Sequence, residues 1–210
     1  MPNSERTLIP LFPLPLALVP GEVVPLHIFE ERYKRLIAEC RAGGGEFGVL
    51  LQQKDVVAGA GCTARMVEVI EEFEDGRLNL LVEGRRRFRL LEVVEPADPE
   101  GECLHGQIEY FGDLSAEAAL DIQEKAVALF LRMLALMDVE SPRRPVGEEP
   151  LSFLLAAAVD FGVALKQQLL ESISETERLE TLVTVIETLI PRLELRRDRE
   201  EAIRGNGKGV

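Results

Sequence analysis

The pattern of apolar and polar residues divides this chain of 210 residues into two parts. Up to about residue 112, apolar residues alternate with polar ones or gather in short runs, as they do in β-strands. Beyond that point they recur every three or four positions, which predicts amphipathic helices. We therefore expect an α+β protein with a β-rich lobe over residues 1–112, a helical bundle lobe over residues 113–204 and a disordered tail over residues 205–210.

The β-rich part begins with an apolar segment from Leu8 to Ile28 that is interrupted by prolines at positions 10, 13, 15, 20 and 25. Each proline removes a backbone hydrogen-bond donor that lipid cannot replace, so the segment does not predict a membrane-spanning helix. It also lacks the basic leader and the small-residue cleavage site of a signal peptide. We expect two short strands that fold toward one another around an exposed turn at Pro20–Gly21 and that close a small barrel.

One helix and several further strands complete the predicted β-rich part. The helix covers Phe29–Arg41, where apolar residues recur at helical spacing, and the glycines at 43–45 end it. The strongest hairpin signal is Asp75–Gly76, which lies between two alternating runs. The predicted strands cover residues 47–52, 62–73, 78–82, 85–94 and 104–111, with a loop at 55–61 and a second turn at Glu83–Gly84.

Four helices are predicted in the second part. Ser115 is suited to cap the first helix, and Pro150 is suited to the first turn of the second. The S-x-x-E sequence of Ser174 and Glu177 predicts a capping box for the last helix. Pro191 should bend that helix, because its ring removes one backbone hydrogen bond. The expected helices cover residues 115–137, 151–159, 165–171 and 174–199.

Charge and cysteine content narrow the class of protein. The net charge of −13 is spread over both parts and disfavours nucleic acid as a partner, since phosphate binding relies on clustered lysine and arginine. Cys40, Cys62 and Cys103 are odd in number and far apart, which favours neither a disulfide framework nor a zinc ribbon. We expect three reduced thiols and, with no targeting segment in the sequence, a cytoplasmic protein.

Few residues in the sequence are candidates for catalysis or for metal binding. His27 and His105 lie in predicted strands, and the sequence has no H-x-x-x-H, C-x-x-C or G-x-S-x-G pattern that would make them metal ligands or parts of a catalytic site. The acidic residues at 71, 72, 74 and 75 surround a hairpin tip, where a solvated surface is more common than a cation site. The sequence therefore predicts no catalytic residue, no cofactor and no metal.

Arg85, Arg86, Arg87 and Arg89 are the one basic concentration in the sequence. In an extended strand Arg85, Arg87 and Arg89 share one face. Arg86 alternates onto the other face with Phe88. One hypothesis is that Arg85, Arg87 and Arg89 contact a ligand, either an anion or an acidic peptide. The other hypothesis, which we favour, is a polar strand face that pairs with nearby glutamates.

The order and spacing of three segments resemble the N-terminal substrate-binding domain of the ATP-dependent Lon proteases, and the stand-alone bacterial proteins that consist of that domain. The segments are IPLFPLPLALVPGEVVPLHIFEERYKRLI, VEVIEEFEDGRLNLLVEGRRRFRLLEVVE and KQQLLESISETERLETLVTVIETL. The middle segment is the most specific, with its strand, D-G turn, strand and LVEG-R-x-R. The resemblance extends from Leu8 to about Leu195 and implies a PUA-like β-barrel lobe with one helix, followed by a helical bundle lobe.

The resemblance implies recognition of protein substrates. The sequence contains no G-x-x-x-x-G-K-[ST] motif, so we expect neither an ATPase nor a protease. The leading hypothesis is a non-catalytic adaptor that binds unfolded protein or peptide segments in a crevice between the lobes. A protease or chaperone is a candidate partner, and a membrane is not. The alternatives are an RNA-binding PUA-like protein and a small enzyme with an unrecognised site.

Overall fold

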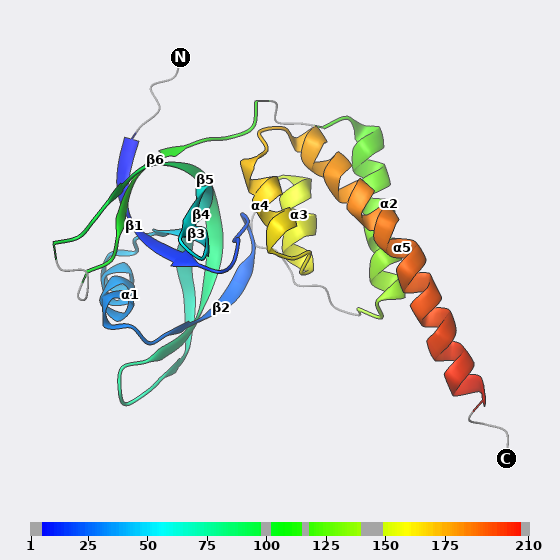
Figure 1. The fold of residues 1–210 in the computed structure, drawn as a ribbon, viewed down its shortest axis with the longest axis horizontal. Helices are drawn as coiled ribbons and strands as arrows, with labels where there is room; N and C mark the ends of the chain where they lie inside the picture. The colour runs from blue at the N-terminus through cyan, green and yellow to red at the C-terminus, as the bar shows by residue number, and fades with distance from the viewer. Residues whose placement is uncertain (1–5, 98–101, 115–117, 140–148, 207–210) are drawn as a thin grey trace.

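The computed structural model describes residues 6–97, 102–114, 118–139 and 149–206. Within these ranges the chain forms six strands and five helices, which confirms the predicted α+β class. Figure 1 shows the strands and α1 on one side of the molecule and the other helices on the opposite side. The elements are β1 (Arg6–Leu14), β2 (Val23–Ile28), α1 (Glu31–Gly43), β3 (Phe47–Gln53), β4 (Val56–Glu72), β5 (Leu78–Val94), β6 (His105–Tyr110), α2 (Leu120–Leu136), α3 (Leu151–Ala158), α4 (Val163–Glu171) and α5 (Glu175–Asn206).

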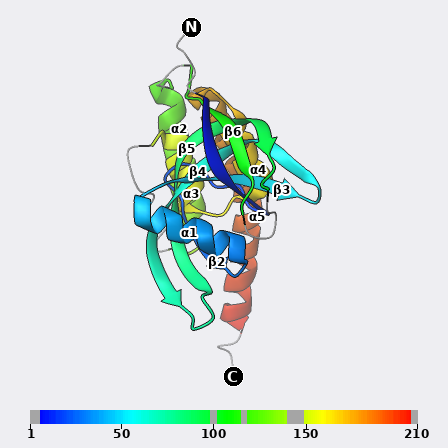
Figure 2. The same cartoon turned by 90° about the vertical axis from the view of Figure 1, so that its left-hand side faces the viewer.

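The strands form one sheet that closes on itself. Their order is β2-β5-β4-β3-β1-β6, and β5 also pairs with β6, so five strands make a hydrogen-bonded ring to which β2 is added at the edge of β5. β1 lies parallel to β3 and antiparallel to β6. Helix α1 packs against the ring (Figure 2). At this contact the Tyr33 ring stacks on the Phe12 ring with centroids 3.9 Å apart. Ring closure leaves few strand edges open to solvent.

Two groups of buried apolar side chains hold the molecule together. A small cluster comes from four strands of the ring and consists of Ile9, Leu11, Leu50, Phe88 and Ile108. A larger cluster runs without a break from the strands and α1 into the helices, joining Leu18 and Val49 to Phe153 and Leu170. Because the strands and the helices share this core, burial of apolar surface stabilises both parts together.

The β1–β2 segment differs from the expectation in its pairing. β1 pairs with β3 and β6, whereas β2 pairs with β5, so the two arms do not pair with one another. The Pro20–Gly21 turn forms, and Gly21 has the predicted positive φ of 74°. However, both turn residues are buried rather than exposed. The turn lies against β5, because the Gly21 amide donates a 2.9 Å hydrogen bond to the carbonyl of Gly84.

Two predicted breaks in the sheet are wrong. The expected loop at 55–61 is the first part of β4, which follows a tight turn where Lys54 has a φ of 55°. The expected turn at Glu83–Gly84 lies inside β5, which continues for 17 residues. Gly84 has a different role there, since a Cβ at this position would overlap the carbonyl oxygen of Val19. The glycine lets the backbone before β2 approach β5 closely. The hairpin predicted at Asp75–Gly76 is confirmed, with Gly76 at a φ of 78°.

The helices follow the predicted order with shifted ends. The predicted cap Ser115 and most of the loop before α3 lie outside the described residues, and α2 begins after Ala119. Gly162 precedes α4 as its N-cap residue. α5 continues through Pro191 to Asn206, and the rest of the predicted tail, residues 207–210, lies outside the described residues. No helix in the described ranges is long and apolar enough to cross a membrane.

Half of the predicted capping box forms at the start of α5. The Glu177 amide donates to Ser174 Oγ at 3.3 Å, as a capping box requires. The Glu177 carboxylate does not return to the Ser174 amide but accepts a hydrogen bond from Ser172 Oγ at 3.1 Å. The Ser174 amide donates to the same Ser172 hydroxyl instead. Ser172 therefore takes over the second half of the cap.

We expect all three cysteines to resist thiol reagents in the native state. Cys40, Cys62 and Cys103 are free and buried, and burial raises the pKa of each thiol, that of Cys103 to about 11. Because the thiolate is the reactive form, native labelling at neutral pH should be slower than labelling in denaturant by about a hundredfold or more. Spectrophotometric thiol titration with and without urea measures this ratio, and rapid labelling of the native chain would contradict the burial of these thiols.

Candidate functional site

An open pocket lies where the strands meet the helices. Its volume is about 440 Å³. The middle of β5 and the segment after β6 form one wall, the start of α3 forms the other, and the β1–β2 turn closes one side. The lining residues are Pro20, Arg85, Arg86, Arg87, Tyr110, Phe111, Gly112, Asp113, Glu149, Pro150 and Phe153. The pocket therefore combines aromatic rings and prolines with three adjacent arginines.

The four arginines of the predicted basic run have different environments. Arg85 is half-buried and donates to Glu83 at 3.1 Å, which agrees with the predicted pairing to a nearby glutamate. Arg87 is buried. Arg89 is exposed and does not line the pocket, although it shares a strand face with Arg87, as predicted. Both guanidinium groups lie 4.8 Å from the centre of the Phe111 ring.

Arg86 was not among the predicted ligand contacts, yet it lies on the pocket wall. Its guanidinium carbon is 3.7 Å from the centre of the Tyr110 ring, a distance typical of stacked groups. Its backbone amide is held by Thr63 Oγ1 at 3.1 Å. Among the described residues, the Arg86 side chain makes no ion pair. Its charge is thus exposed to solvent in a fixed position.

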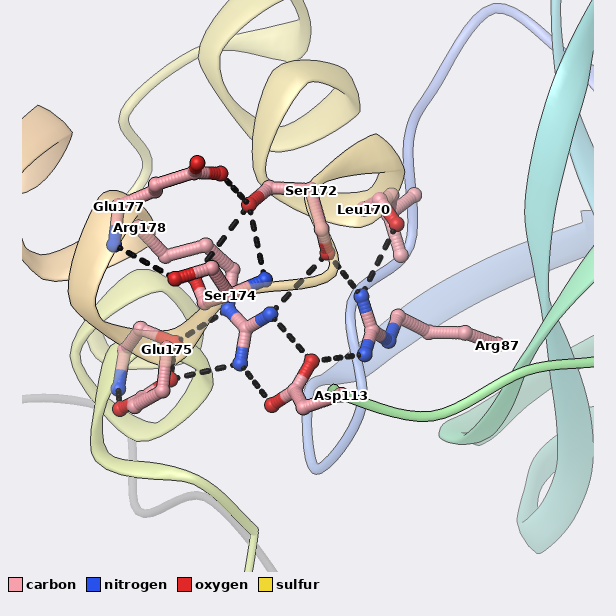
Figure 3. Close-up of polar contacts among 9 residues, drawn as sticks. Arg87, Asp113, Leu170, Ser172, Ser174, Glu175, Glu177 and Arg178 are labelled. Carbon is pink, nitrogen blue, oxygen red and sulfur yellow. Dashed lines mark hydrogen bonds and ion pairs between the residues drawn. The ribbon is translucent and has the colours of Figure 1, made fainter. Parts of the chain in front are cut away.

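Asp113 joins two buried arginines beside the pocket (Figure 3). One carboxylate oxygen accepts hydrogen bonds from Arg87 Nη2 at 2.5 Å and from Arg178 Nη1 at 2.7 Å, and the other accepts from Arg178 Nη2 at 2.5 Å. The three side chains are 8% exposed or less. Burial alone would raise the pKa of Asp113, but the hydrogen bonds and charges of Arg178 and Arg87 outweigh it and hold the pKa below its ordinary value.

The same network extends into the helices. Arg178 Nη2 bonds Glu175 Oε2 at 2.6 Å, and Arg178 Nε donates to Ser152 Oγ at 2.8 Å. Glu175 Oε1 accepts from the backbone amide of Ser152 at 2.8 Å, which caps the first turn of α3. Arg87 also donates to the carbonyl oxygens of Leu170 and Ser172 (Figure 3). The network connects β5 and the segment after β6 to α3, α4 and α5.

A second group of polar contacts joins the two sides of the molecule. Lys166 Nζ on α4 lies 2.6 Å from Glu22 Oε1, and both side chains are buried. Gln167 Nε2 donates to the carbonyl oxygen of Ala60 at 3.1 Å. These contacts and the Asp113 network hold the pocket walls at a fixed separation.

The comparison with known families gives a direct match. Residues 8–188 match the family model of the ATP-dependent protease La (LON) substrate-binding domain. The chain belongs to this family. The assignment confirms the resemblance seen in the sequence, and it covers the strands, α1, α2, α3, α4 and the first half of α5.

Related proteins and solved structures agree with the Lon family assignment. A Lon protease of Anaeromyxobacter dehalogenans is 28% identical over 94% of this chain, and one of Flavobacterium johnsoniae is 26% identical over 96%. The chain spans about a quarter of the length of these proteases. The crystal structure of a Lon N-terminal domain protein from Xanthomonas campestris is 28% identical, with a TM-score of 0.66 over 85% of this chain and 98% of that one. The N-terminal domain of a Mycobacterium avium complex Lon protease has the same fold, with 20% identity, a TM-score of 0.64 and coverage of 86% of this chain and 98% of that one.

Among the described residues that line the pocket of this Lon-type domain, Glu149 is the one acidic group outside the Asp113 network. It precedes α3 and is half-buried. Burial raises the pKa of Glu149, while the charges of Arg85 and Arg87 act in the opposite direction. The pocket that Arg86 lines therefore also holds a carboxyl group whose charged form burial disfavours.

The other candidates from the sequence make local contacts in the Lon-type domain. His27 Nδ1 lies 2.7 Å from Asn79 Oδ1 on the neighbouring strand, and His105 Nδ1 lies 3.1 Å from the carbonyl oxygen of Cys103. At the hairpin tip, Asp75 bonds Arg77 at 2.7 Å. The described part of the chain holds no group of three or more histidine, cysteine, aspartate or glutamate residues placed to bind a metal ion.

Sequence reasoning missed Asp113, Arg178 and Glu175. One signal was present in the helical pattern. Arg178 and Glu175 occur at the spacing of the apolar stripe of α5, where buried residues such as Leu182 recur. A charged residue at such a position needs a buried partner. The identity of that partner, Asp113, had no signal in the local sequence.

Proposed function

We propose that this Lon-type domain is a non-catalytic module that binds unfolded or extended polypeptide segments. The observation that carries the proposal is the pocket between the strands and the helices, because it offers aromatic rings, prolines and cationic groups side by side. Main-chain and apolar side-chain contacts of an extended peptide suit such a surface. The family, which is described as a substrate-binding domain, supports the same role.

The proposal includes the two lobes and the adaptor role that the resemblance to Lon implies. We take the closed ring of strands as the PUA-like barrel of the first lobe, and α2 to α5 as the helical bundle of the second. An adaptor of this kind would deliver bound segments to a partner protease or chaperone. The absence of catalytic function and the cytoplasmic location remain predictions.

A pocket-filling substitution tests the proposal directly. Gly112 lines the pocket, and a Cβ at this position would meet no atom within 4 Å, so Gly112→Phe should place a ring in the pocket without displacing the backbone. We expect it to weaken peptide binding by about tenfold or more, since a filled pocket excludes the ligand. The domain has no tryptophan, so the fluorescence of a tryptophan-containing unfolded polypeptide reports binding.

Gly59→Phe is the matched control, because Gly59 also has open space around its Cβ and does not line the pocket. It should bind as the unsubstituted domain does. No binding beyond that of an unrelated protein of similar net charge would contradict the proposed function. Binding of RNA with a steep salt dependence, in place of peptide, would favour the RNA-binding alternative.

A further inference from the structure

The strongest unassigned feature of the pocket is a fixed cation without a counterion. The Arg86 guanidinium stacks on Tyr110, and among the described residues it makes no ion pair. A guanidinium that lies flat on a ring still directs its N–H groups outward in its own plane. Those donors have the fork geometry that fits the two oxygens of a carboxylate.

The neighbouring charges add to this cation. Glu83 is 1% exposed and is shared by Arg85 at 3.1 Å and Arg65 at 2.9 Å, so two cations meet one carboxylate there. In the Asp113 network, the cations Arg87 and Arg178 are matched by two carboxylates. The excess positive charge at the pocket therefore comes from Arg86 and from the two arginines, Arg85 and Arg65, that share the single carboxylate of Glu83.

The walls beside these arginines are apolar. Phe111, Phe153, Pro20 and Pro150 line the same pocket. A carboxylate that reaches Arg86 would therefore have its neighbouring side chain next to aromatic rings and prolines. This favours an apolar residue adjacent to the carboxylate, because its burial adds a non-directional contribution to binding.

The overall charge favours one carboxylate over a polyphosphate. A nucleic acid needs an extended basic surface along its backbone, whereas this domain has a net charge of −13, and among the described residues that line the pocket Arg86 is the arginine without an ion pair. A single carboxylate interacts with Arg86 within the Debye length of about 8 Å, beyond which the repulsion from distant acidic groups is screened.

We propose that the pocket recognises a carboxylate next to an apolar side chain, with Arg86 as the primary contact and Arg85 as the second. The carboxylate comes from the C-terminus of a polypeptide or from an aspartate or glutamate within it. This inference rests on the proposed function and names the chemical group that the pocket selects. Glu149 acts against the ligand, because its carboxyl group lines the same pocket.

The test compares ligands that differ only in this group. Labelled peptides that end in leucine are prepared with a free C-terminal carboxylate, with a C-terminal amide, and as the amide with one internal glutamate. Fluorescence anisotropy should show at least about tenfold weaker binding of the plain amide, the loss expected for one charge-assisted hydrogen-bonded pair. Recovery of affinity by the internal glutamate identifies side-chain carboxylates as ligands, and its absence identifies the C-terminus.

Substitutions test which side chains cause the preference for the free acid over the amide. Arg86→Ala should weaken binding of the free acid about tenfold and leave the amide unchanged, whereas Arg86→Lys should keep part of the difference. Glu149→Gln should strengthen binding of the free acid. Arg192→Ala removes an exposed arginine of α5 that does not line the pocket and should have no effect. Circular dichroism verifies that each variant is folded.

The inference and the proposed function fail in different ways. Equal affinity for the free acid and the amides, with binding still blocked by Gly112→Phe, overturns the carboxylate inference and leaves peptide binding intact. A second measurement does not need a long peptide: N-acetyl-leucine, but not its amide, should shift the NMR signal of Arg86 Nε–H. No shift with either compound, or a larger shift with inorganic phosphate, overturns the inference.

Discussion

Asp113→Ala should lower the free energy of unfolding by about 3 to 5 kcal/mol, because it leaves two buried guanidinium groups without their shared counterion. The Arg178 side chain is 0% exposed and that of Arg87 is 5% exposed, so water cannot replace the lost carboxylate. A domain has only about 5 to 15 kcal/mol of stability in total, so this loss should be large. Urea unfolding followed by circular dichroism measures it, since the chain contains no tryptophan.

Glu187→Ala is the matched control for the Asp113 variant. Glu187 pairs with Lys125 at 2.9 Å, but both side chains are about half exposed. Solvent screens such a pair, and its loss should cost less than about 1 kcal/mol. An Asp113→Ala variant that loses no more stability than Glu187→Ala would show that the buried network does not hold the strands and helices together.

Lowering the pH should reduce the difference in the free energy of unfolding between the Asp113→Ala variant and the unsubstituted chain. The pKa of Asp113 lies below its ordinary value in the folded state, so its contribution to stability is present above about pH 4, the ordinary value for the unfolded chain. That contribution is lost as the pH falls through the lowered folded-state value. Unfolding curves at a series of pH values should therefore converge at low pH. If the stability difference between the two proteins stayed constant down to low pH, the stability lost in Asp113→Ala would come from packing rather than from charge.

Local signals in the sequence predict the local structure well. Asp75–Gly76 between two alternating runs predicts the β4–β5 hairpin, and Gly44 ends α1 with the expected left-handed conformation. Gly84 shows where such signals fail. A glycine after a glutamate has the composition of a turn, but Gly84 lies within a strand that the distant Val19 approaches. The sequence shows a glycine at this position, but it does not predict which distant segment of the chain lies against it.

At the candidate site, too, the sequence predicts local contacts but not those between distant segments. The basic run is visible in the sequence, and the pairing of Arg85 with the adjacent Glu83 follows from their spacing. The partners of Arg87 come from the segment after β6, from the last turn of α4 and from the α4–α5 connection, and only the packing of the helices on the strands brings these segments together. The division of the run into a buried arginine, Arg87, and an exposed one, Arg86, is therefore a property of the tertiary fold.

Gly84→Ala should destabilise the domain by about 3 kcal/mol, the upper range for overpacking at a closed site. The added methyl group would overlap the carbonyl oxygen of Val19, which is backbone and cannot rotate away as a side chain would. It would also strain the hydrogen bonds in which the Gly84 amide donates to Glu22 at 2.8 Å and the Gly84 carbonyl accepts from Gly21 at 2.9 Å. Urea unfolding monitored by circular dichroism measures the loss.

Gly59→Ala provides the comparison within the same sheet. Gly59 lies in β4 and does not have a positive φ, and a methyl group added there would meet no atom within 4 Å. The change should alter stability by less than about 1 kcal/mol and can be stabilising, because alanine has less conformational freedom in the unfolded chain. Equal stability of the two variants would mean that the backbone around Val19 yields to the methyl group. Gly84→Ala should also weaken peptide binding at temperatures where it is folded, because Pro20, which lines the pocket, directly follows the displaced Val19.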